Sequence, residues 1–249
     1  MPDLVASARR LASGGALLAA LLAAPAAAQI PTSTQDRVTT PVPPSLEEVA
    51  RTDAVFRDAV ACVVRYQPGR TRNLLDTIPG TDAEHTILAS FQSRLNQCYD
   101  YHRNQGRSMS FSLNLLRGAI AEIYFRREFP DGLIPAADAP PELAAAWVRP
   151  RSRDGSTTQS EMLHAMARCV AVRRPGGVGA MIAAEPFTPR ELDAIRGMQE
   201  DLSACLDAGV AFEASRQALR GLLAEAALHY AEARRDGFAR VGRSEPSPE

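Results

Sequence analysis

Two cysteine pairs with the same spacing constrain the fold of this chain more than any other feature. Cys62 and Cys98 are 36 residues apart, and Cys169 and Cys205 repeat that separation 107 positions later. Across the 39 positions from 62 to 100, 11 residues are identical at this offset. Self-similarity of this kind predicts a tandem duplication of a unit of about 75 residues.

The match continues after a short deletion, at an offset of 103. There the segment LRGAIAE at 116–122 corresponds to LRGLLAE at 219–225. We call two residues corresponding when one of these offsets relates them. A residue kept at both places is expected to build the unit, whereas a residue present at one place only is free to serve a function.

Helix signals occur throughout both units. Thr81 and Glu84, like Thr188 and Glu191, fit a capping box, in which the glutamate bonds back to the amide of the capping threonine. A proline starts a new helix about two turns after the first cysteine of each unit. The expected helices are 46–67, 68–77, 82–101 and 112–129 in the first unit, and 158–174, 175–184, 189–208 and 214–236 in the second. No stretch alternates as a half-buried strand would, so we predict an all-α fold of two four-helix units.

The repeated spacing favours one disulfide in each unit. Four cysteines allow three pairings, and Cys62–Cys98 with Cys169–Cys205 closes each unit independently. Such a ring stabilises the fold by about 4 kcal/mol through the entropy of the unfolded chain. The alternatives are four buried thiols or, with less support, a zinc site, because no Cys-x-x-Cys motif or matching histidine is present.

A glycine in the last helix of each unit predicts a close approach by another helix, since glycine there costs up to about 1 kcal/mol relative to alanine. These glycines are Gly118 and Gly221. We expect the charged residues beside them to bond to backbone or charges inside their own unit; these residues are Arg117, Glu122, Arg220 and Glu225. A pair of catalytic carboxylates is the alternative interpretation of the two glutamates.

The N-terminus predicts export. Two arginines precede an apolar run of 14 residues, and small residues at 26–28 suit cleavage by a signal peptidase after Ala28. A buried N-terminal helix is the alternative. Without residues 1–28 the chain carries 26 basic and 28 acidic residues, a balance that argues against nucleic acid as a partner. No later segment suits membrane insertion, and we predict a periplasmic or secreted protein in which disulfides can form.

The expected organisation follows from these boundaries. The ranges are 1–28 for the signal peptide, 29–44 for a flexible linker, 45–129 for the first unit, 130–157 for the linker between units, 158–236 for the second unit and 237–249 for a disordered tail.

The search for chemistry gives few candidates. All 28 basic residues are arginine, which excludes mechanisms that require a lysine amine. We expect no catalytic residue, metal or cofactor. A polar and aromatic set found in one unit only is the candidate contact surface, and an ordinary solvated face is the alternative; the set is Tyr99, Tyr101, His102 and Arg103. Trp147, the single tryptophan, is expected either to pack between the units or to be an exposed contact for a ligand or partner.

These features favour a non-enzymatic interaction or scaffold module of the cell envelope, with an envelope protein or peptide as partner. The alternative is a small-ligand binder or hydrolase that uses a cleft between the units lined by Tyr99, His102 and Trp147.

Overall fold

A computed structural model describes residues 45–102, 112–133, 159–206 and 214–236. These residues form nine α-helices and no strand, which confirms the predicted all-α class. The predicted signal peptide, the 29–44 linker, Trp147 and the tail lie outside the described residues. We call 45–129 the first stretch and 158–236 the second stretch.

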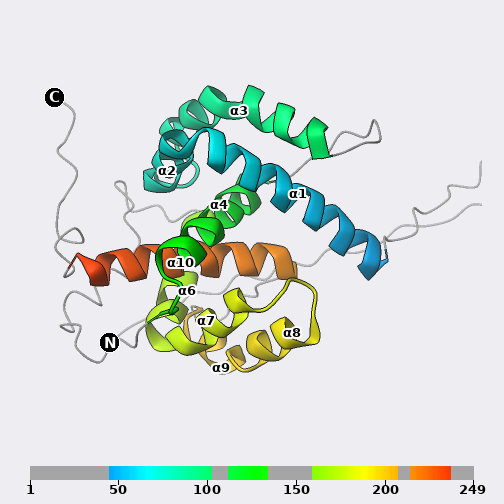
Figure 1. Cartoon of the computed structure of the whole chain (residues 1–249). Helices are drawn as coiled ribbons and strands as arrows, with labels where there is room; N and C mark the ends of the chain where they lie inside the picture. Colours follow the sequence, from blue (N-terminus) through cyan, green and yellow to red (C-terminus); the bar gives the residue numbers. More distant parts are fainter. Residues whose placement is uncertain (1–44, 103–111, 134–158, 207–213, 237–249) are drawn as a thin grey trace, which may run out of the picture. The chain divides into compact units, whose positions relative to one another are not determined.

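The helices follow the predicted order along both stretches (Figure 1). The first stretch contains α1 (Leu46–Tyr66), α2 (Pro68–Asp76), α3 (Asp82–His102) and α4 (Leu113–Glu128). The second contains α6 (Gln159–Arg173), α7 (Pro175–Ala183), α8 (Pro189–Arg196), α9 (Gln199–Ala204) and α10 (Arg216–Arg235). Proline occupies the first position of α2 and α7, where its missing N–H costs no hydrogen bond.

The start of α3 differs slightly from the predicted capping box. The amide of Glu84 donates to the Thr81 hydroxyl at 3.4 Å, as expected, but the Glu84 carboxylate accepts from the Gly80 amide at 2.7 Å instead of the Thr81 amide. At the start of α8, Glu191 accepts in the same way from the Phe187 amide at 2.7 Å. Gly80 and Phe187 correspond, and both have positive φ, which turns each of these amides toward its glutamate.

The prediction of one helix over 189–208 is wrong, because the helix breaks at Gly197 and Met198 into α8 and α9. The Met198 side chain is fully buried and lies against Gly177 of α7, where an added Cβ would approach its Cγ to 2.7 Å. Burial of the Met198 side chain stabilises the break more than a continued helix would. The low helix propensity of Gly197 makes the break less costly.

The α4 and α10 helices cross at the predicted glycines and form the most extensive helix contact of the described residues (Figure 1). A Cβ atom placed on Gly118 would lie 2.1 Å from the Cα atom of Gly221. The two backbones therefore touch directly, which only glycine at position 118 allows.

One hydrophobic core includes side chains from both stretches. Val60 and Leu116 of the first stretch and Val170 and Leu223 of the second are fully buried members of it. All described residues also belong to one compact unit, Pro43–Glu249.

The predicted disulfides are present. Cys62 pairs with Cys98 across α1 and α3, with Cα atoms 5.8 Å apart. Cys169 pairs with Cys205 after the end of α9, with Cα atoms 5.7 Å apart. No cysteine is free.

Candidate functional site

The charged residues beside the α4–α10 crossing bond inside their own stretch, as predicted, and also across the crossing, which was not predicted. Arg117 donates to Glu225 at 2.5 Å and Arg220 donates to Glu122 at 2.7 Å. The arginine side chains are 1 % exposed. Facing helices supply complementary charges here, a relationship that neither segment reveals by itself.

Each arginine also bonds within its own stretch, and the carboxylate and carbonyl acceptors of the two arginines correspond; Arg117 has one further acceptor, the Thr77 hydroxyl at 2.9 Å. Arg117 donates to Glu84 at 3.0 Å and Arg220 donates to Glu191 at 2.9 Å. The carbonyl acceptors of Arg117 are Leu74, Leu75 and Thr77, and those of Arg220 are Met181, Ile182 and Ala184. Both guanidinium groups are thus saturated with acceptors, as buried charges require.

This bonding argues against the catalytic interpretation of the two glutamates. Burial raises the pKa of Glu122, but the hydrogen bond from Arg220 and the charges of Arg57 and Arg220 outweigh it and lower the pKa from 4.5 to about 2. Burial likewise raises the pKa of Glu225, while the charge of Arg117 leads the effects that hold it well below its usual range. Both groups are carboxylates committed to ion pairs and do not serve as proton donors near neutral pH.

Most of the predicted contact surface lies outside the side chains that the structure describes. Tyr99 is half-buried and packs against the hydrophobic core. Tyr101 and His102 belong to the last turn of α3, where their side chains are not described. Arg103 and Trp147 lie outside the described residues. The predicted set therefore stays untested, apart from Tyr99, whose ring contributes to packing.

A groove of about 570 Å³ lies between α1 and α3 on the outside of the Cys62–Cys98 disulfide. Its lining residues are Asp58, Ala61, Cys62, Arg65 and Tyr66 from α1 and Arg94, Gln97 and Cys98 from α3. On α1 these positions recur at helical spacing on the outer face, while Ala59, Val60, Val63 and Val64 point into the core. The disulfide joins the two helices at the floor of the groove and keeps them from moving apart.

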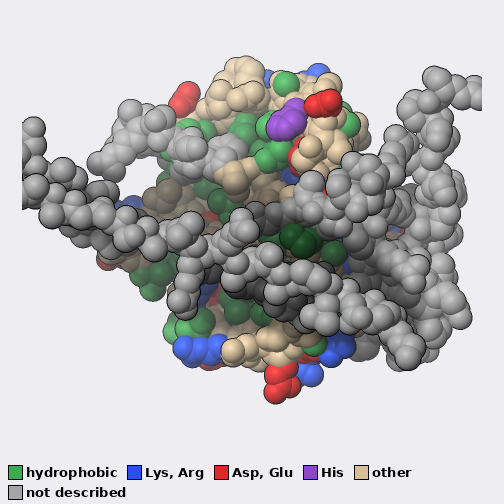
Figure 2. Space-filling view, turned by 180° about the vertical axis from the view of Figure 1, so that it is seen from behind, with side chains coloured by type: hydrophobic (Ala, Val, Ile, Leu, Met, Phe, Trp, Pro, Cys, Tyr) green, Lys and Arg blue, Asp and Glu red, His purple; other side chains and the backbone are tan. Residues whose placement is uncertain are grey.

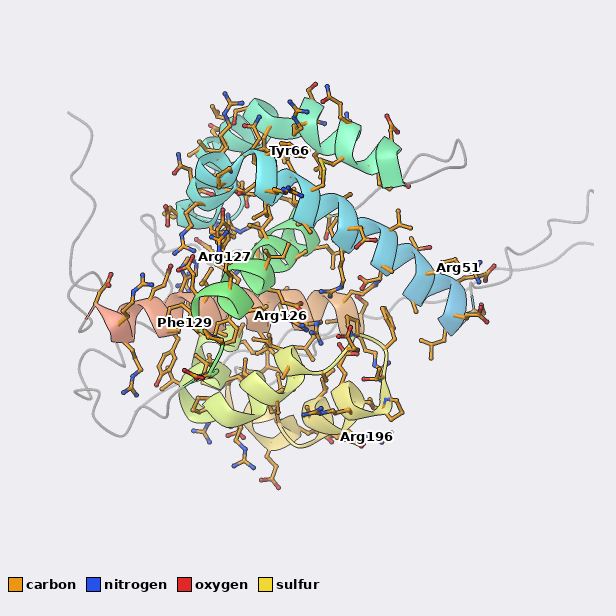
Figure 3. All side chains as sticks on the ribbon, in the orientation of Figure 1. Arg51, Tyr66, Arg126, Arg127, Phe129 and Arg196 are labelled. Atoms are coloured by element: carbon orange, nitrogen blue, oxygen red, sulfur yellow. A yellow bond between two sulfur atoms is a disulfide. The ribbon has the colours of Figure 1, made fainter. Side chains whose placement is uncertain are left out.

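Aromatic and cationic side chains dominate the rim of this groove. Tyr66 ends α1 beside α3 and is 62 % exposed (Figure 3). The Arg94 guanidinium lies over its ring, 5.4 Å from the ring centre. Arg65 and Asp58 are exposed and form no ion pair within the described part of the chain. The groove thus offers two guanidinium groups, one carboxylate and one large aromatic surface to solvent.

The corresponding face of the second stretch carries an ion pair instead of the aromatic side chain. Tyr66 and Arg94 correspond to Arg173 and Asp201, which form an ion pair at 3.3 Å. Arg174 approaches Asp201 as well, at 3.8 Å. Figure 2 shows arginine and carboxylate side chains intermixed along the edge that the second stretch forms. The exposed aromatic and its stacked arginine are therefore a feature of the first stretch alone.

The sequence contained a signal for this groove. Asp58 and Tyr66 lie four residues before and after Cys62, and Arg94 lies four residues before Cys98. Residues four apart share a helix face, so the disulfide marks the face that they occupy. The predicted contact surface began instead at Tyr99, the residue after Cys98. The Tyr99 side chain packs against the hydrophobic core.

The described residues contain no group of histidine, cysteine and carboxylate side chains arranged to hold a metal ion. Among them, no helix combines the length and apolar character needed to cross a membrane. Comparisons of the chain with family models, with curated proteins and with solved structures find no match.

Proposed function

We propose that this protein is an exported, non-enzymatic interaction module of the cell envelope, built by tandem duplication of a helical unit. In this proposal the α1–α3 groove of the first unit binds an extended acidic segment of another envelope protein. The observation that carries the proposal is the groove itself, which presents an exposed aromatic side chain in the first stretch, whereas the corresponding residues of the second stretch form an ion pair.

The chemistry of the groove favours an acidic partner. Arg65 and Arg94 can donate paired hydrogen bonds to a carboxylate, and Asp58 offsets only one of the two positive charges. Tyr66 offers an apolar ring with a polar tip, a combination enriched at the energetic centres of protein interfaces. A segment with an Asp or Glu next to an apolar side chain fits both features.

Duplication is supported by the corresponding carboxylate and carbonyl acceptors of Arg117 and Arg220. Export is supported by the two disulfides, which form and persist in oxidising compartments, and by the apolar run that precedes Ala28. A shared core and saturated ion pairs make a rigid support, on which a binding surface costs little ordering entropy.

No specific observation favours the alternative of a small-ligand binder or hydrolase. Tyr99 packs against the core, and Glu122 and Glu225 are engaged with arginines. The cleft lined by Tyr99, His102 and Trp147 stays a prediction.

Selection of peptides from a random displayed library tests the proposal with the mature protein. We expect the wild type to enrich peptides in which Asp or Glu neighbours an apolar residue. The charge-reversed variant Arg65→Glu, Arg94→Glu should bind those peptides at least about 10-fold more weakly, a loss of about 1.4 kcal/mol. The matched control is Arg190→Glu, Arg196→Glu, which makes the same charge change at exposed sites on α8.

Two results would overturn the proposal. One is enrichment of peptides that lack carboxylates. The other is equal loss of binding in the groove variant and the α8 control, which would show that net charge and not the groove decides binding.

A further inference from the structure

The two carboxylates at the centre of the helix crossing have unequal surroundings. Glu122 accepts from Arg220, and two further arginines approach it: Arg57 of α1 at 2.8 Å and Arg126 of its own helix at 3.0 Å. Arg126 leaves α4 on the side that faces the second stretch (Figure 3). Three guanidinium groups therefore surround Glu122, and all of them stay charged throughout the physiological pH range.

Histidines occupy the corresponding places around Glu225. Arg57 corresponds to His164 of α6, and Arg126 corresponds to His229 of α10. The His229 ring lies 3.8 Å from Glu225 and 3.5 Å from Glu232. Both replacements exchange a permanently charged guanidinium for an imidazole, a ring that exists in neutral and charged forms.

His164 is the buried member of this pair. It is 5 % exposed, and its Nε2 atom has no hydrogen-bond partner. The charged groups that face it are Glu225 and His229 of α10, Arg117 of α4 and Arg168 of its own helix. From the other helices packed on α6, α7 has no titratable side chain, and Asp201 of α9 is paired with Arg173 and Arg174.

A proton on His164 is therefore poorly accommodated in the folded protein. Burial lowers the pKa of His164; Glu225 opposes this effect, and Arg117, Arg168 and His229 add to it. A proton placed on Nε2 would also be a buried donor without an acceptor, which costs free energy. The neutral ring suits the folded state, and the charged ring suits a state in which α6 has moved away.

We propose that the α6–α10 contact at His164 is an acid-sensitive joint, at which mild acid loosens α6 while α1 stays closed on Glu122. The direction of this pH dependence follows from the linkage between protonation and folding. Because His164 binds its proton less readily when folded, its contribution to stability is complete above about pH 6.5 and declines as the pH falls below that value. Arg57, at the corresponding place on α1, keeps its charge over the same range, so the first stretch has no such joint.

Hydrogen exchange of the mature protein tests this proposal, with rates corrected for the intrinsic effect of pH. Between pH 7.5 and 5.5, we expect protection of α6 peptides to fall by up to about 10-fold per pH unit below 6.5, which is the effect of one linked proton. Protection of α1 peptides should not change. The variant His164→Gln should remove the pH dependence of α6, and His229→Gln should retain most of it.

Protection of α6 that is independent of pH, or that falls equally in the His164→Gln variant, would overturn the proposal. If that variant does not fold, the imidazole resonances of the wild type decide the matter. We expect protonation of His164 and loss of α6 protection to share one midpoint; protonation while α6 stays protected would contradict the joint.

Discussion

Gly118 and Gly221 touch through their backbones where α4 crosses α10, and the contact is not symmetric. A Cβ on Gly118 would lie 2.1 Å from the Gly221 Cα, whereas a Cβ on Gly221 would lie 3.3 Å from the Gly118 Cα. The first distance requires the helices to move apart, and the second requires a shift of a few tenths of an ångström. The crossing carries the ion pairs and part of the core, so a displacement here disturbs both.

Alanine substitution tests this asymmetry. Gly118→Ala should lower the free energy of unfolding by about 3 kcal/mol, because overpacking against backbone cannot relax. Gly221→Ala should cost no more than about 1 kcal/mol, since the gain in helix propensity offsets the smaller clash. Urea unfolding of both variants measures the difference. Equal losses, or a larger loss for Gly221→Ala, would contradict the close approach.

The buried arginines should differ in importance despite their matching bonds. Arg117→Met leaves Glu225 with only two histidines and should cost about 3–5 kcal/mol at pH 7.5. Arg220→Met leaves Glu122 with Arg57 and Arg126 and should cost at least about 1 kcal/mol less. Denaturant unfolding of the matched pair decides the order. A larger loss for Arg220→Met would mean that the flanking arginines do not compensate.

Strong acid should destabilise the protein through Glu122. Its pKa of about 2 in the folded protein is below the ordinary 4.5, so its contribution is complete above about pH 5 and is lost as the pH falls toward 2. The total is about 3 kcal/mol. Glu122→Gln should therefore reduce the slope of stability against pH between 4.5 and 2.5 by up to about 1.4 kcal/mol per pH unit. An unchanged slope would show that the surrounding arginines do not stabilise the charged form of Glu122.

Export should leave a chain that begins at Gln29. Intact mass spectrometry of protein recovered from outside the cytoplasm should show loss of residues 1–28. Ala28→Arg places a large charged side chain at the expected cleavage site and should leave the leader attached. A wild-type mass that includes residues 1–28 would refute the predicted cleavage.

Local signals in the sequence predicted most helix starts, because capping residues and prolines act on their immediate neighbours. Pro68 and Pro175 begin α2 and α7, as expected, and Ser45 caps α1 with a full capping box. The break at Met198 was not predictable in this way, since it depends on the fit of that side chain against Gly177.

The hydrogen-bond partners across the α4–α10 crossing also could not be predicted from the sequence. The pattern marked Arg117 and Glu225 as building residues, but only the packing of α4 against α10 shows that they bond to each other. The groove could have been predicted from the sequence, because Tyr66 and Arg94 lie one helical turn from the cysteines that the disulfide joins. The residues after Cys98 were predicted instead, and the first of them, Tyr99, packs against the hydrophobic core.

Site-specific photocrosslinking of the protein tests the proposed binding groove most directly. Gln97 lies in the groove, and the exposed Ala204 is its corresponding residue in the second stretch, so a photoreactive amino acid at each provides a matched pair. We predict a crosslink from position 97 to an acidic segment of one partner, lost in the Arg65→Glu, Arg94→Glu variant and absent from position 204. Equal crosslinking from both positions, or a crosslink from position 97 that survives charge reversal, would contradict it.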